Sequence, residues 1–170
     1  MYDPTIFENL KVAFENQLYD LDNLEGRVTI LNRTDTMDFA SISRELMLQF
    51  ALGKQADLFG QLILRAGLED LAGEILDLSG KDIGCTLILR IHMKVADIPE
   101  QCSKVEQALN GIWENDVHIT QTLSFIYGEE SPYINTIEVI FQPKINEDNM
   151  NEIPDFLESV IESMEILKGI

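Results

Sequence analysis

Leu89–Val95 reads LRIHMKV, and its four apolar side chains alternate with Arg90, His92 and Lys94. Successive side chains of a β-strand point to opposite faces of the sheet, so this alternation predicts a strand with one buried and one outward face. The same pattern extends back along the chain, and we expect one long strand over Ile83–Val95. The basic residues of LRIHMKV then lie together on the face turned away from the core.

Two later segments alternate in the same way and are separated by a short turn. Val117–Tyr127 and Tyr133–Gln142 each place apolar residues on one face and mostly polar residues on the other, with Gln121 as an exception on the apolar side. The short connection between them predicts antiparallel pairing. Arg27–Asn32 is expected to be a further strand. Ser41–Leu52 fits both a strand and a helix, and that choice stays open.

Apolar residues at three- and four-residue spacing predict helices near the N-terminus, directly after the strand Ile83–Val95, and at the C-terminus. One helix is expected over the stripe Phe7 to Leu21, one after Asp97-Ile98-Pro99, and one from about Pro154 to Leu167. Gln55–Leu78 also has a helical spacing of apolar residues, although glycines interrupt it.

These elements predict one α+β domain over residues 1–170. It has two layers: a largely antiparallel sheet of four or five strands, of undetermined strand order, with helices packed on one face. Element types recur at about residues 4–52 and 98–142, which suggests an internal duplication.

The chain carries 12 Lys and Arg against 30 Asp and Glu, a formal net charge of -18. This charge repels nucleic-acid phosphates and anionic membranes, so neither is an expected partner. The N-terminal residues lack the basic and apolar regions of a secretory signal, which favours a cytoplasmic location. Cys85 and Cys102 are expected to be small apolar side chains facing the core.

The candidate binding surface is the polar side of the second-half strands. Its expected residues, which would bind a small anion or a protein, are Arg90, His92, Lys94, His118, Thr120, Thr122 and Glu138. His92, His118 and Glu138 are the potential metal ligands on this face, but a metal site normally needs three or four ligands held close together, and the register of the strands is unknown. Neither a metal nor a cofactor is therefore predicted. The sequence shows none of the common nucleophile, phosphate-loop or zinc motifs, and no catalytic residue is assigned.

Three roles are compatible with these features. The first is a non-catalytic protein-interaction or regulatory domain that self-associates or binds another protein through the open sheet face or a sheet edge. The second is a small-anion or ligand-binding module that uses the basic stripe. The third is an acidic mimic of nucleic acid that binds a basic protein.

Overall fold

A computed structural model describes residues 5–54, 57–76, 83–114 and 117–170 of the chain. In chain order its elements are α1 (Thr5–Asn23), β1 (Val28–Asp38), β2 (Ser43–Leu52), β3 (Phe59–Ala66), α2 (Leu68–Ile75), β4 (Thr86–Val95), α3 (Ile98–Trp113), β5 (Val117–Ser124), β6 (Tyr133–Phe141), η1 (Glu147–Glu152) and α4 (Ile153–Lys168). The expected α+β class is confirmed.

Within the described residues, six strands form one antiparallel sheet in the order β1-β2-β3-β4-β6-β5. The expectation of four or five strands is therefore wrong. Ser41–Leu52, for which strand and helix were both open, contains the strand β2. This strand pairs along its length with both β1 and β3. β6 lies between β4 and β5, although β5 comes first along the chain.

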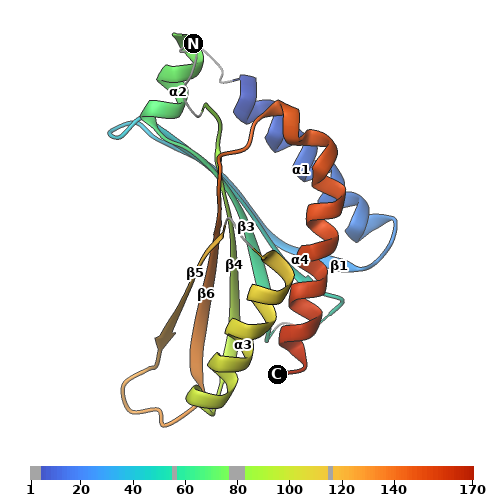
Figure 1. Cartoon of the computed structure of the whole chain (residues 1–170), viewed down its shortest axis with the longest axis vertical. Coiled ribbons are helices and arrows are strands. Elements are labelled where there is room, and N and C mark those ends of the chain that lie inside the picture. The colour runs from blue at the N-terminus through green and yellow to red at the C-terminus, as the bar shows by residue number, and fades with distance from the viewer. Residues whose placement is uncertain (1–4, 55–56, 77–82, 115–116) are drawn as a thin grey trace.

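Helices α1, α3 and α4 lie on the same side of the sheet, while α2 lies at one end of it (Figure 1). The core between these layers is apolar, and its helix side includes Phe7, Phe14 and Val160. Phe14 of α1 contacts Phe156 of α4 edge to face, with ring centroids 6.1 Å apart. Burial of these stripes holds the helices on the sheet.

Local signals explain where several elements begin. The Asp97 side chain accepts a hydrogen bond from the backbone N–H of Glu100, and Pro99 occupies the first turn of α3. Both features favour a helix start at this point. α4 likewise begins with a proline in its first turn, close to the expected position.

The segment expected to be helical, Gln55–Leu78, instead contains β3 and the short helix α2 within its described part. Gly60 explains one of the interruptions in that pattern. A Cβ atom at Gly60 would lie 3.0 Å from Met164 Sδ and 3.2 Å from Phe50 Cζ. The glycine therefore allows α4 to approach the sheet closely.

Gln121, the exception to the alternation of β5, belongs to a polar contact on the helix side of the sheet. Its Nε2 donates to the backbone carbonyl of Cys102 in α3 at 3.0 Å, and its Oε1 accepts from Asn135 Nδ2 at 2.9 Å. Asn135 is fully buried. Cys85 is buried and Cys102 is half-buried, so the expectation of core-facing cysteines holds fully for the first and partly for the second.

Both segments of the suggested duplication contain a helix followed by an antiparallel hairpin: α1-β1-β2 and α3-β5-β6. Common descent of the two stays a hypothesis. Of the helices in the described ranges, none has the length and apolar character needed to cross a membrane.

Candidate functional site: the open face of the sheet

The sheet face opposite α1, α3 and α4 is the open face of the molecule (Figure 1). The strand register arranges its side chains in rows that run across the sheet. The three central rows from β2 to β5 are Met47-Ile63-Ile88-Ile140-His118, Gln49-Gln61-Arg90-Glu138-Thr120 and Ala51-Phe59-His92-Thr136-Thr122. The expected site residues, apart from Lys94, all fall in these rows.

The middle row is joined by polar contacts between neighbouring strands. Gln61 Nε2 donates to Gln49 Oε1 at 3.0 Å, and the guanidinium of Arg90 donates twice to Glu138 Oε2, at 3.0 and 3.1 Å. Thr120 lies opposite Glu138 at the edge of the sheet and is exposed. Three residues of the predicted site, Arg90, Glu138 and Thr120, therefore meet in one row.

His92 occupies the next row and is half-buried. Its ring stacks on Phe59 with centroids 4.7 Å apart, and its Nδ1 lies 3.3 Å from Thr136 Oγ1. Burial of the imidazole, followed by the nearby charge of Arg90, lowers the pKa of His92 below its ordinary value. The stacked, half-buried ring acts as a packing element of this face.

Lys94 lies at the end of β4 and completes the basic stripe. Its Nζ is 3.3 Å from Oδ1 of Asp57, which lies two residues before the start of β3. Arg65 on β3 contacts Glu45 on β2 at 2.8 Å. Between β2 and β5 the described side chains on the open face therefore pair three cations with three carboxylates: Arg65, Arg90 and Lys94 with Glu45, Glu138 and Asp57.

The two histidines share the open face but do not meet. His92 lies opposite Thr136, and His118 lies opposite Ile140, so they are separated by four residues along β6 and by the width of two strand spacings. This corresponds to about 13 Å along and about 10 Å across the sheet. In the described part of the chain, no group of three or more His, Cys, Asp or Glu side chains is arranged to hold a metal ion.

β3 contributes to this face residues that are absent from the set expected from the sequence. The ring of Phe59 stacks on His92, and Gln61 lies opposite Arg90. Asp57 is the ion-pair partner of Lys94. The signal was obscured because Ile63, on the open face, is apolar and fully buried. A strict alternation of polar and apolar residues is therefore absent from β3.

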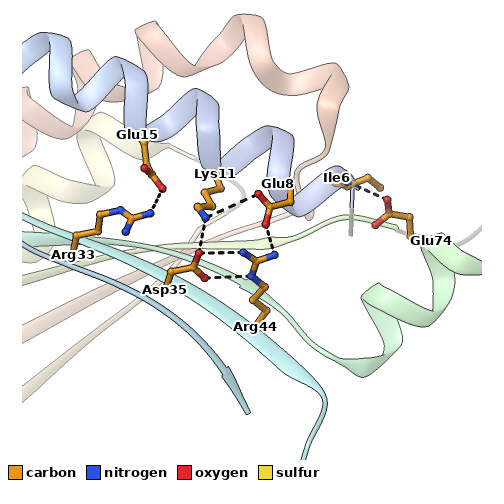
Figure 2. A network of polar contacts seen from close by, with 8 residues as sticks. All are labelled: Ile6, Glu8, Lys11, Glu15, Arg33, Asp35, Arg44 and Glu74. Carbon is orange, nitrogen blue, oxygen red and sulfur yellow. Dashed lines mark hydrogen bonds and ion pairs between the residues drawn. The ribbon is translucent and has the colours of Figure 1, made fainter. Parts of the chain in front are cut away.

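A second polar cluster lies on the helix side of the sheet, where the N-terminal half of α1 crosses β1 and β2. Figure 2 shows Asp35 between Lys11 and Arg44, with Glu8 contacting both cations. Lys11 Nζ is 2.6 Å and Arg44 Nη2 3.1 Å from Asp35 Oδ2. The Arg44 guanidinium also lies over the ring of Phe7 at 4.6 Å.

This cluster fastens α1 to the sheet. Burial raises the pKa of the Asp35 carboxyl, but the hydrogen bonds and charges of Arg44 and Lys11 outweigh burial, and the pKa lies below its ordinary value. Glu15 and Arg33 form a neighbouring pair at 2.8 Å that joins the same two elements. Because each charge has a partner within the cluster, its role is structural.

Comparison with protein-family models, curated proteins and solved structures finds no match for this chain.

Proposed function

We propose that this chain is a non-catalytic protein-interaction domain that self-associates through the sheet layer left open by the helices. The observation that carries this proposal is the pairing of charges on the open face. A chain with a net charge of -18 repels its own copies. In the region between β2 and β5 on the open face two copies can approach with less repulsion than the net charge implies, because its cations and carboxylates balance.

The composition of the face supports a protein partner. Gln49, Gln61 and Thr120 share the row of the Arg90–Glu138 pair. Amide and hydroxyl side chains of this kind form the direct hydrogen bonds that interfaces between proteins contain.

The contacts of the basic stripe favour this role over small-anion binding. An anion at Arg90 would lie beside the carboxylate of Glu138, and an anion at Lys94 would lie beside that of Asp57. Each carboxylate would repel the added anion. Balanced charge suits a protein surface better than it suits an anion site.

The test is sedimentation equilibrium over a wide range of protein concentration. We expect a reversible dimer, and we expect Arg90→Glu to weaken it because the variant places two carboxylates side by side on the open face. The double variant Arg90→Glu, Glu138→Arg restores the pair in reversed order and should restore dimerisation. A parent protein that stays monomeric at every concentration refutes the proposal.

Lys104→Glu is the matched control. Lys104 lies on the helix layer, is exposed, and contacts Glu100 at 2.9 Å. This variant changes the net charge by the same amount as Arg90→Glu but leaves the open face intact. Equal weakening by both variants would show that total charge, and not the open face, controls association.

A further inference from the structure

The two edge strands of the sheet, β1 and β5, differ in how they are protected. β1 contains a bulge between Ile30 and Asn32, and two of its charged side chains, Arg33 and Asp35, contact α1. Bulges and charged side chains are the usual means by which edge strands avoid pairing with other chains. β1 is therefore a poor template for a further strand.

β5 has none of these features. Its sequence, VHITQTLS, contains no Lys, Arg, Asp, Glu or Pro. It pairs with β6 in an unbroken register from Val117 to Ser124, and in the described part of the chain β6 is its sole strand partner. One row of backbone N–H and C=O groups of β5 thus faces outward along a regular, uncharged edge.

The side chains of β5 are also incompletely covered. Its inward residues Val117, Ile119 and Leu123 remain half-buried, in contrast to the fully buried Ile137 and Val139 of β6. An added strand beside β5 would cover their remaining apolar surface, which stabilises association.

The loop that follows β5 adds a cluster of exposed apolar side chains at the same edge. Phe125 and Ile126 are each 66% exposed and Tyr127 is 97% exposed. A hydrogen bond from the N–H of Glu129 to the carbonyl of Ile126, at 3.0 Å, closes the turn that presents them. Contiguous exposed apolar side chains of this size commonly mark an interaction site.

We infer that two copies of this chain pair antiparallel along β5 about a twofold axis, so that the two six-stranded sheets form one continuous sheet. This inference rests on the proposed self-association and places its contact at the β5 edge of the sheet. Because β6 separates Arg90 on β4 from that edge, Arg90→Glu should weaken the dimer less than a charge introduced on β5 itself. A second copy fits this edge because β5 itself carries no charged side chain. Two copies of a chain with a net charge of -18 can therefore pair along β5 without placing like charges of the two strands opposite each other. A twofold axis also lets each β5 satisfy the outward backbone groups of the other.

Single cysteines on the open-face side of β5 test the pairing through disulfide cross-linking. The positions are His118, Thr120, Thr122 and Ser124, all exposed. The background is Cys102→Ser. Cys85 can remain because burial raises the pKa of its thiol to about 12.

When two identical strands pair antiparallel about a twofold axis, only the residue at the axis lies opposite the same residue of the other copy. We expect cross-linking that peaks at one of the four positions and falls on both sides of it. If the axis passes through a residue of the other face, the peak appears in a mixture of the two variants on either side of that residue, such as Thr120→Cys and Thr122→Cys for an axis at Gln121. Gln61→Cys, at the centre of the open face, should stay uncross-linked.

Two charge variants provide an independent measurement. Thr122→Glu should raise the dimer dissociation constant at least tenfold, since it places two carboxylates near one axis. Thr34→Glu makes the same change on β1, at the opposite edge, and should leave the dissociation constant unchanged.

The outcomes separate this inference from the proposed function. The edge pairing is wrong if the dimer cross-links through Gln61→Cys. It is also wrong if the dimer is insensitive to Thr122→Glu and fails to cross-link through β5. In both cases the proposed self-association still holds. A protein that is monomeric at every concentration overturns both.

Discussion

Asp35→Asn removes the charge at the centre of the contact between α1 and the β1–β2 hairpin. The carboxylate lies 2.6 Å from Lys11 Nζ and accepts two hydrogen bonds from Arg44, at 3.1 and 3.2 Å. Its side chain is 18% exposed, and those of its two partners are 17% and 15% exposed. Asparagine preserves the size of the side chain but loses the charge that both cations contact.

The expected loss follows from these contacts. Removing a partner from a hydrogen bond to a charged group costs about 1.5–3 kcal/mol. Glu8 remains near both cations and offsets part of the loss of Asp35. We therefore expect the free energy of unfolding at neutral pH to fall by about 2 kcal/mol, which lowers the melting temperature by about 4–8 °C in a domain of this size.

Glu45→Gln is the control, since it breaks a similar pair on the other face of the same hairpin. Glu45 and its partner Arg65 are 37% and 45% exposed. Exposed pairs contribute about 0.2–1 kcal/mol, so this variant should lose much less stability than Asp35→Asn. Urea unfolding of both variants measures the difference. Equal losses would refute the assignment of Asp35 as the anchor of α1.

The pH dependence gives a second check. The pKa of Asp35 in the folded protein lies below its ordinary value of 3.8, so the unfolded chain takes up the proton first as pH falls. The stabilisation from Asp35 is complete above that value and is lost as pH falls through the lower, folded pKa. The stability gap between the parent and Asp35→Asn should therefore stay constant from neutral pH to about pH 5 and narrow below about pH 4. A gap that narrows near neutral pH contradicts this reasoning.

Three further outcomes are expected. His92 has a lowered pKa in the folded protein, so the unfolded state binds its proton first and the free energy of unfolding should decline as pH falls below 6.5. Urea unfolding should show that His92→Gln removes this decline. Gly60→Ala should destabilise the fold by about 1–3 kcal/mol, because the new Cβ would press against Met164. Gly111→Ala should stabilise it by about 0.5–1 kcal/mol, because the new Cβ meets open space inside α3. Thermal unfolding measures both changes. Added salt should tighten the dimer in sedimentation experiments by screening repulsion between two acidic chains; dissociation by salt would instead point to contacts between opposite charges.

The face on which each side chain lies follows from local sequence wherever polar and apolar residues alternate. This is why the orientation of Arg90, His92 and Lys94 was predictable from β4 alone, and why Asp97 and Pro99 marked the start of α3. Both signals act over a few residues, so they are readable without knowledge of the rest of the fold.

β3 was not predictable in the same way because its open-face residue Ile63 is apolar and buried by its surroundings. Leu62 and Leu64 face the helices, so with Ile63 they form an unbroken run of three large apolar residues that lacks the alternation of a half-exposed strand. Such a run is compatible with either structure until the neighbouring strands are known.

The partners of the candidate site depend on strand order, which is a property of the whole sheet. β6 separates β4 from β5, and this placement brings Glu138 to Arg90 and keeps His92 away from His118. Asp57 reaches Lys94 because β3 pairs with β4. Periodicity within a single strand carries no information about these neighbours.

The contact between Gln121 and Asn135 has a consequence for how β5 and β6 align during folding. None of the β5 side chains is fully buried, so burial fixes the alignment of β5 less firmly than it fixes that of β6. Strands of this kind are prone to pair out of register. A shift of β5 by one residue would carry Gln121 to the opposite face and leave the buried amide of Asn135 and the carbonyl of Cys102 without their hydrogen bonds. Two amide side chains thus select a single alignment for the strand whose outer edge is the most regular in the sheet.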